Sequence, residues 1–201
     1  KSDMPYLGVS AVPLRTVCKG LFKDLTYADS ADWRADVLAI WRGAQFREER
    51  YAAIALSGIR AAGGWQRMDA LPMYEEMIVS GAWWDYVDTI ASHRLILLLR
   101  AEPVAMKAAM LDWAVGDDMW KRRSAIICQL EAKRETDLDL LERAIGPSME
   151  SREFFLRKAI GWALRHYART DLDWDGDYVR RHEDRLSGLS KREALKHIRD
   201  V

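Results

Sequence analysis

An aromatic and an acidic side chain lie four residues apart in the segment from Trp83 to Asp88. Residues four apart on a helix share a face, so Trp84 and Asp88 are predicted to lie side by side. A carboxylate in such a place can stabilise a developing positive charge or orient a water molecule. The alternative is that Trp84 is a core aromatic residue and Asp88 a surface charge, because Trp is usually well buried.

Three consecutive cations, residues 121–123, follow Trp120. They fall at the predicted start of a helix, where positive charge opposes the helix dipole. This unfavourable placement suggests an anionic partner. An equally good alternative is a solvated turn whose charge the acidic residues 117–118 compensate.

A third segment carries one aromatic and two cationic side chains on one predicted helix face. Trp162, Arg165 and Arg169 follow one another at i, i+3 and i+7. The opposite face is apolar and contains Leu156, Ile160, Ala163, Leu164 and Tyr167. An indole beside two guanidinium groups suits stacking combined with phosphate contact. The alternative is a Trp at the edge of the core, with arginines whose aliphatic stems cover apolar surface.

Other chemistries lack their residue patterns. The 4 His residues form no HExxH pair, and Cys18 and Cys128 have no metal or disulfide spacing. No glycine-rich phosphate loop is present. The Asp residues at 171, 173, 175 and 177 alternate as in a calcium loop, but Trp174 interrupts them and the required Gly and Glu are missing. We therefore predict a turn there, no metal and no cofactor.

The composition is that of an ordinary globular protein, with 49% hydrophobic and 31% charged residues and a net charge of zero. Zero net charge is a weak argument against a nucleic-acid partner. The charge is uneven, however, because residues 119–169 contain eleven Lys or Arg and seven Asp or Glu. The longest apolar run, residues 95–99, is too short to cross a membrane, and no leader opens the chain. We expect a cytoplasmic protein without a membrane partner.

Apolar residues recur at spacings of three and four, which predicts helices almost throughout. Three segments share an aromatic residue followed six positions later by Ile: Trp84 to Ile90, Trp120 to Ile126 and Phe154 to Ile160. Repetition at intervals of 36 and 34 residues is typical of paired-helix HEAT repeats. We predict an all-α fold, a curved α-solenoid of HEAT-like repeats, in a single domain over residues 1–201.

Local signals place several helix boundaries. Gly63-Gly64 is expected to end one helix, and Gly146-Pro147-Ser148 to separate two others. Pro103 is expected in the first turn of a helix that runs to about Ala114, and Asp117-Asp118 is expected to cap a helix from Met119 to Leu130. Ser190 and Glu193 are expected to form a capping box that starts a last helix from Ser190 to Arg199.

Five segments together resemble the AlkD-type DNA alkylation repair glycosylases, a HEAT-like helical family. They are Tyr6-Leu7-Gly8-Val9, Trp83-Trp84-Asp85-x-Val87-Asp88, Trp120-x-x-Arg123-x-Ala125-Ile126, Phe154-Phe155-x-x-Lys158-Ala159-Ile160-Gly161-Trp162-x-Leu164-Arg165-x-Tyr167 and Leu189-Ser190-Lys191-Arg192-Glu193-Ala194-x-Lys196-His197-Ile198. They lie in the family's order and span nearly the whole chain. The second and fourth are the specific ones.

The resemblance implies particular site residues. In that family two Trp and one Asp approach the deoxyribose of the lesion, and an Arg beside them contacts the backbone. By motif match these residues are Trp84, Trp162, Asp88 and Arg123. Further DNA contacts on the concave face are predicted from Arg165, Arg169, Lys158, Lys121, Trp120 and Ser10. The family has another helix before the first motif, which we expect this chain to lack.

The resemblance also implies a monofunctional glycosylase, monomeric and associated with the nucleoid when bound to DNA. Its substrate would be a purine alkylated at N3 or N7 in duplex DNA. Such a base is cationic and leaves as a neutral species, so no general acid is needed. Asp88 would stabilise the oxocarbenium-like sugar and orient the attacking water. The family acts without flipping the base into a pocket, in contrast to many glycosylases.

A second interpretation is a non-catalytic HEAT-like module that binds branched DNA or a protein partner. Relatives of that kind are expected to lose the set formed by Trp84, Asp88 and Trp162, which this chain keeps. A protein-binding solenoid would instead show an apolar concave groove. The retained set favours the enzyme.

Overall fold

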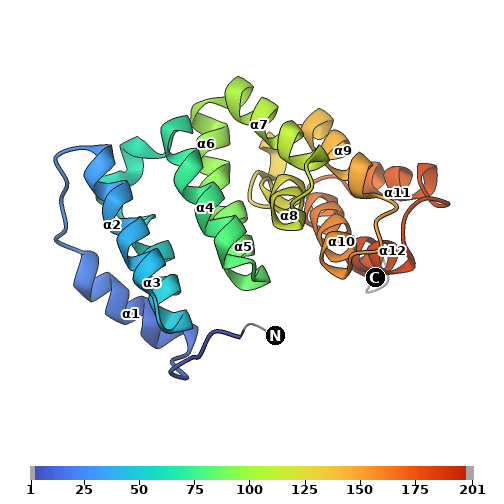
Figure 1. Cartoon of the computed structure of the whole chain (residues 1–201). Helices are drawn as coiled ribbons and strands as arrows, with labels where there is room; N and C mark the ends of the chain where they lie inside the picture. The colour runs from blue at the N-terminus through green and yellow to red at the C-terminus, as the bar shows by residue number, and fades with distance from the viewer. Residues whose placement is uncertain (1–2, 198–201) are drawn as a thin grey trace. The chain divides into compact units, whose positions relative to one another are not determined.

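The computed structural model describes residues 3–197, and every regular element in that range is helical (Figure 1). The predicted all-α fold is therefore confirmed. The helices fall into two compact units, Lys1–Ile90 and Ala91–Val201. A single domain over the whole chain stays a prediction. Between residues 3 and 197, no helix has both the length and the apolar character needed to cross a membrane.

The described part of the first unit contains five α-helices. They are α1 (Ala11–Phe22), α2 (Ser30–Gly43), α3 (Arg47–Leu56), α4 (Leu71–Gly81) and α5 (Trp84–Ile90), with the short 3₁₀ helices η1 (Arg60–Trp65) and η2 (Met68–Ala70) before α4. Helix α2 lies beside α3, and α4 packs against α5 (Figure 1). The core holds several fully buried large side chains, among them Trp33, Trp41, Tyr74 and Tyr86.

The described part of the second unit begins with a π-helical turn, η3 (Ala91–Leu95). The helices that follow are α6 (Ile96–Ala101), α7 (Pro103–Val115), α8 (Met119–Ile127), α9 (Leu138–Ile145), α10 (Phe154–Ala168), α11 (Leu172–Arg181) and α12 (Gly188–Ala194), with the 3₁₀ helices η4 (Lys133–Glu135), η5 (Gly146–Ser148) and η6 (Leu195–His197). Helix α8 packs against α7 and α10, and α10 packs most extensively against α12.

The three aromatic segments of the sequence repeat all start helices. Trp84 opens α5, Trp120 is the second residue of α8, and Phe154 opens α10. The Ile six positions later is buried in each of the three helices. The repeat therefore marks equivalent turns of successive helix pairs, as a HEAT-like arrangement requires.

Short polar side chains set where several helices begin. Asp118 caps α8 by accepting a hydrogen bond from the backbone N–H of Lys121 at 2.8 Å. Asp137 and Asp171 do the same for α9 and α11. Each cap satisfies a backbone donor that the helix cannot satisfy itself. The prediction that Asp117-Asp118 caps the helix beginning at Met119 is confirmed, with Asp118 as the capping residue. The helix ends at Ile127, however, and not at Leu130 as predicted.

Three local predictions are wrong. Gly63-Gly64 lies within the 3₁₀ helix η1, seven residues beyond the end of α3 at Leu56. The alternating Asp residues form no turn, because Asp171 caps α11 and the other three lie in that helix. Ser190 and Glu193 form no capping box: Ser187 caps α12, which begins at Gly188. The end of the predicted last helix, residues 198–199, lies outside the described residues.

Candidate active site and DNA-contact residues

Helix α5 of the first unit carries the predicted catalytic carboxylate. Trp84, in its first turn, is 41% exposed, whereas Asp88 is only 8% exposed. The alternative interpretation, in which Trp84 is a core residue and Asp88 a surface charge, is therefore wrong for both residues. Helix α5 thus combines a buried carboxylate with an exposed indole one helical turn away.

Contacts with α3 hold the start of α5. The Tyr51 hydroxyl donates a hydrogen bond to Asp85, and Arg47 lies over the Trp83 ring, 5.2 Å from its centroid. Burial, followed by the bond to Asp85, raises the pKa of Tyr51, so this hydroxyl stays a donor across the physiological range. The Trp83 and Trp84 rings are 6.1 Å apart. The exposed indole is therefore anchored through its neighbour.

The first motif, residues 6–9, is held by a carboxylate of α3. Glu48 accepts hydrogen bonds from the backbone N–H groups of Leu7 and Val9 at 3.0 and 3.1 Å. Burial opposes ionisation of Glu48, but these bonds outweigh it and lower its pKa. Gly8 has a φ of 82°, which glycine adopts without strain. Ser10, a predicted DNA contact, follows directly at the N-cap of α1 and makes no side-chain capping bond.

In the second unit, Arg123 lies on α8 and is only 2% exposed. Its guanidinium donates a hydrogen bond to the carbonyl oxygen of Phe155, and it lies over that ring, 5.9 Å from the centroid. The Trp120 and Phe155 rings are 4.9 Å apart. These contacts join the starts of α8 and α10. A desolvated guanidinium of this kind interacts strongly with any anion that reaches it.

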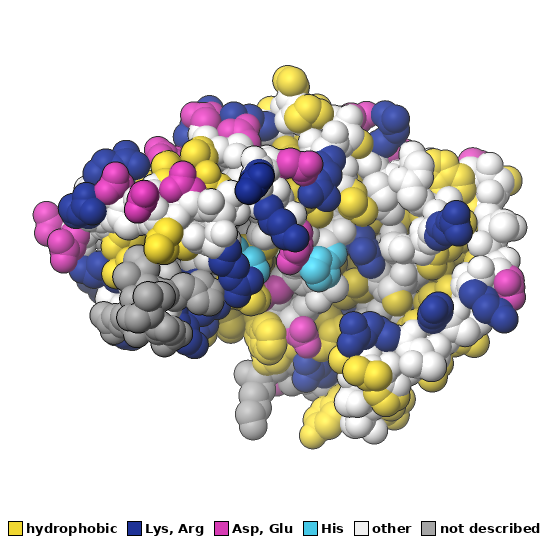
Figure 2. All heavy atoms as spheres, turned by 180° about the vertical axis from the view of Figure 1, so that it is seen from behind, with side chains coloured by type: hydrophobic (Ala, Val, Ile, Leu, Met, Phe, Trp, Pro, Cys, Tyr) yellow, Lys and Arg dark blue, Asp and Glu magenta, His cyan; other side chains and the backbone are white. Residues whose placement is uncertain are grey.

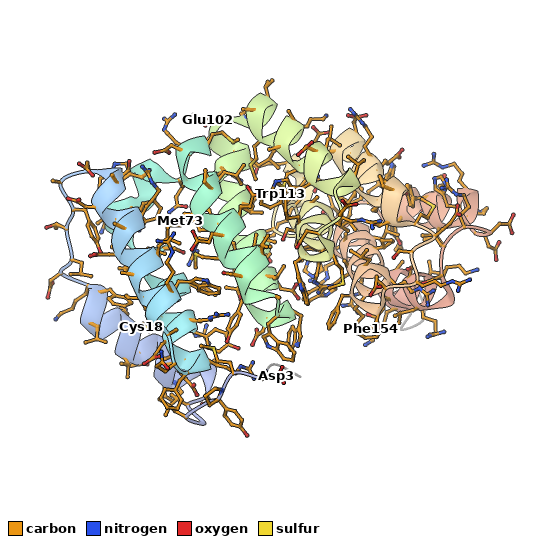
Figure 3. All side chains as sticks on the ribbon, viewed as in Figure 1. Asp3, Cys18, Met73, Glu102, Trp113 and Phe154 are labelled. Carbon is orange, nitrogen blue, oxygen red and sulfur yellow. The ribbon has the colours of Figure 1, made fainter. Side chains whose placement is uncertain are left out.

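The other two cations at the start of α8 have local partners. Lys121 lies over the Trp113 ring at 5.1 Å (Trp113 is labelled in Figure 3). Arg122 donates hydrogen bonds to the Pro147 carbonyl and the Ser148 hydroxyl, both at 3.0 Å. Arg122 thus ties α8 to η5. Its position at the helix start has a structural explanation and needs no anionic partner.

Helix α10 carries three of the remaining predicted contacts, Lys158, Trp162 and Arg165, and the fourth, Arg169, follows its last residue. Trp162 is half-buried, with its ring edge-on to His166 at 5.9 Å. Arg169 is exposed and lies one residue beyond the helix end. The predicted apolar face is largely buried, although Tyr167 is half-buried. The aromatic–cationic stripe therefore exists, with Trp162 at the edge of the core.

Glu193, which was predicted to form a capping box, instead forms ion pairs with two of the predicted DNA-contact residues. Glu193 on α12 pairs with Lys158 at 2.6 Å and with Arg165 at 3.1 Å. The bond from Lys158, with the charge of both cations, lowers the pKa of Glu193 against the effect of burial. Gly161 makes this possible, since a Cβ there would lie 2.5 Å from that of Glu193. The sequence signal for the close approach of α10 and α12 is Gly161 on the same helix face as Lys158 and Arg165, at spacings of three and four residues.

Charge is mixed on the surface as well. On the face shown in Figure 2, Lys and Arg side chains lie among Asp and Glu side chains. Within the described residues no group of three or more His, Cys, Asp or Glu is arranged to hold a metal ion. Trp84, Asp88 and Ser10 belong to the first unit and the other predicted contacts to the second.

Comparison with known families decides the relationship. The sequence profile described as "DNA alkylation repair enzyme" matches residues 1–198. The chain belongs to this family. A solved structure described as a predicted DNA alkylation repair enzyme from Enterococcus faecalis is 26% identical, with a TM-score of 0.86 over 98% of this chain and 89% of that one. No curated protein sequence gives a significant match.

Family membership indicates a role of the chain in the repair of alkylated DNA. The suspected relationship to AlkD-type proteins is confirmed, and so is the fold of HEAT-like helical repeats. The roles of the individual site residues stay predictions.

Proposed function

We propose that the chain is a monofunctional DNA glycosylase that hydrolyses the N-glycosidic bond of cationic N3- or N7-alkylated purines in duplex DNA. The buried carboxylate of Asp88, on the same short helix as the exposed Trp84 ring, is the observation that carries this proposal. An enclosed carboxylate beside an exposed aromatic face suits a substrate that develops positive charge on its sugar.

The chemistry asks little of the protein. An alkylated purine leaves as a neutral base, which removes the need for a general acid. Asp88 then has two tasks: to stabilise the oxocarbenium-like sugar and to orient the water that attacks it. A pair of unit charges about 4 Å apart is worth on the order of 4 kcal/mol at an effective dielectric near 20. That corresponds to roughly a thousandfold in rate.

The other residues bind and position the nucleotide in this proposal. Trp84 and Trp162 present aromatic faces to the sugar, each contributing about 0.5 to 2 kcal/mol of attraction for positive charge. Arg123 contacts the phosphate backbone. The base is not enclosed in a pocket, so selectivity comes from the lability of the substrate. The enzyme is proposed to act as a monomer in the cytoplasm.

Asp88→Asn is the test. The variant should lose about a thousandfold in the rate of release of 7-methylguanine and 3-methyladenine from methylated duplex DNA. The released base is identified by mass spectrometry under single-turnover conditions. Duplex affinity, measured by fluorescence anisotropy, should hardly change, because the carboxylate acts mainly on the transition state.

Asp112→Asn is the matched control, because Asp112 is an exposed residue of α7 in the second unit. It should keep the wild-type rate. Full excision by the Asp88 variant would refute the mechanism. Wild-type protein that binds the duplex but releases no base would instead support the non-catalytic module.

A further inference from the structure

Arginine and aromatic side chains gather where α2, α3 and the start of α5 meet, outside the residues that the proposed chemistry uses. This arginine–aromatic cluster consists of Trp41, Arg47, Arg50, Tyr51, Trp83 and Tyr86. Arg50 lies over the Trp41 ring at 4.7 Å, and Arg47 lies over the Trp83 ring at 5.2 Å. Two guanidinium groups are thus fixed on aromatic faces, one turn apart on α3.

Neither guanidinium forms an ion pair with a carboxylate among residues 3–197. Arg47 donates to the Tyr51 hydroxyl at 3.0 Å, and Arg50 makes a long contact of 3.4 Å with the Ser80 carbonyl. The Nε atom of each is enclosed without a partner. Both side chains are half-buried and not fully enclosed, and their terminal nitrogens are the part of each cation that would meet an anion.

The carboxylates nearest in sequence are occupied elsewhere. Glu48 accepts from the backbone N–H groups of Leu7 and Val9. Glu49 accepts from the backbone N–H of Phe46 and caps α3. A helix whose first four residues are two cations and two anions would ordinarily pair them across its own turns. Here backbone amides take the anions and leave the cations on the rings.

Two other arginines of the first unit do pair with carboxylates. Arg42 on α2 makes a two-pronged pair with Glu76, with both bonds at 2.6 Å, and Arg34 pairs with Asp69. Carboxylate pairing is therefore available in this unit. Two like charges held together are unfavourable in the isolated protein, and the Asp85 carboxylate reaches Arg47 only through the Tyr51 hydroxyl. A rigid pair of cations of this kind is suited to a phosphate group, because their order is already established before binding.

We propose that Arg47 and Arg50 form a binding subsite for a backbone phosphate of duplex DNA. The inference rests on the proposed function for its ligand, since the Trp83 ring under Arg47 also contacts the ring of Trp84 at 6.1 Å. A phosphate on Arg47 lies one aromatic ring away from the indole that faces the lesion. The subsite binds a phosphate close to the nucleotide that Trp84 contacts, independently of base sequence.

Charge-removing variants at both positions test the subsite. Arg47→Met and Arg50→Met keep an unbranched stem against the rings and remove the cation. Each should weaken binding to an undamaged duplex on the order of tenfold near 0.1 M salt. Each should also lower the slope of log K against log salt by about 0.9, the value for one lost phosphate contact. Arg50→Lys should retain most of that slope, because it keeps the charge.

Arg42→Met is the matched control, because Arg42 is an arginine of the same unit whose charge Glu76 already neutralises. It should leave both duplex affinity and the salt slope unchanged. Thermal unfolding of every variant identifies any loss of fold. Folded Arg47 and Arg50 variants with wild-type affinity and slope would overturn the subsite.

The subsite and the proposed function fail in different ways. If the wild type releases methylated bases but the arginine variants bind normally, only the subsite is wrong. If the arginine variants bind weakly but the wild type releases no base, the glycosylase is wrong and the phosphate subsite stands. Binding of undamaged duplex reports on the arginines alone, and single-turnover release reports on Asp88.

Discussion

Helices α3 and α10 hold their cations in opposite ways. On α3 of the first unit, Arg47 and Arg50 rest on aromatic rings without a carboxylate. On α10 of the second unit, Lys158 and Arg165 share the carboxylate of Glu193. The excess of positive charge in residues 119–169 pointed to the second unit as the main DNA contact. A local excess of positive charge in the sequence therefore does not show which cations lack a carboxylate partner and can bind a phosphate.

Buried carboxylates show the same division. Glu48 of the first unit is held by backbone N–H groups, which lower its pKa despite burial. Asp175 of the second unit, on α11, is fully buried, and neither of its oxygens has a hydrogen-bond partner in the structure. Burial raises the pKa of Asp175 to about 7. Hydrogen bonds thus stabilise the ionised form of Glu48, whereas ionisation of Asp175 opposes folding.

The largest expected effect comes from Asp175→Asn. The folded pKa of about 7 lies above the ordinary value of 3.8, so the unfolded chain releases this proton first as pH rises. Stability is therefore lost between about pH 4 and pH 7, and the loss is complete above pH 7. At pH 8 the Asn variant should be more stable by up to about 4 kcal/mol.

Urea unfolding at several pH values measures this difference. Near pH 3.5 both proteins carry a neutral side chain at 175, so their stabilities should converge. Glu48→Gln should show the opposite sign, with a loss of stability that is greatest at neutral pH, because the lowered pKa of Glu48 stabilises the fold only while it is ionised. A stability gain for Asp175→Asn that does not vary with pH would contradict the assignment.

Sequence reasoning succeeded where local rules decide the structure. The repeat predicted from the aromatic–Ile spacing coincides with the starts of α5 and α10, and Asp118 caps α8 as predicted. It failed where two local signals competed, as when Ser187 and not Ser190 capped α12. Local preferences are weak, and a partner on another helix overrides them.

The candidate site divides in the same way. The motifs named Trp84 and Asp88, but not that the carboxylate would be the buried one. That burial depends on packing against other helices, which spacing along one helix does not encode. The pairing of Glu193 with Lys158 joins residues 35 positions apart. The contacts of Arg47 with the Trp83 ring and of Arg50 with the Ser80 carbonyl also join residues 30 or more positions apart. These are tertiary contacts, and no short sequence motif encodes them.

Gly161→Ala should produce the next largest effect. The added Cβ would lie 2.5 Å from Glu193 Cβ and 2.6 Å from the Ser190 carbonyl oxygen, so α10 and α12 must move apart. Overpacking of this kind costs about 1 to 3 kcal/mol. Thermal unfolding should show the loss.

Gly176→Ala on α11 is the matched control, because a Cβ there meets nothing within 4 Å. Replacing Gly in an open helical position should stabilise the protein by about 0.5 to 1 kcal/mol. Equal melting temperatures for the two Gly variants would mean that α12 adjusts freely, and that its position does not depend on Gly161.

Glu193→Gln should have the smallest effect and sharpens the contrast between the units most. Removing its charge leaves Lys158 and Arg165 unpaired, as Arg47 and Arg50 already are. Duplex affinity should rise about fivefold, equivalent to about 1 kcal/mol. The salt dependence should steepen by up to about 0.9 for each cation released.

A small loss of stability should accompany this gain, because Arg165 is largely enclosed and its Nε has no partner. A fall in affinity with a shallower salt slope would show that Glu193 positions the two cations for DNA and does not compete with it. In that case, both units would present cations fixed in advance, one pair by aromatic rings and the other by a carboxylate.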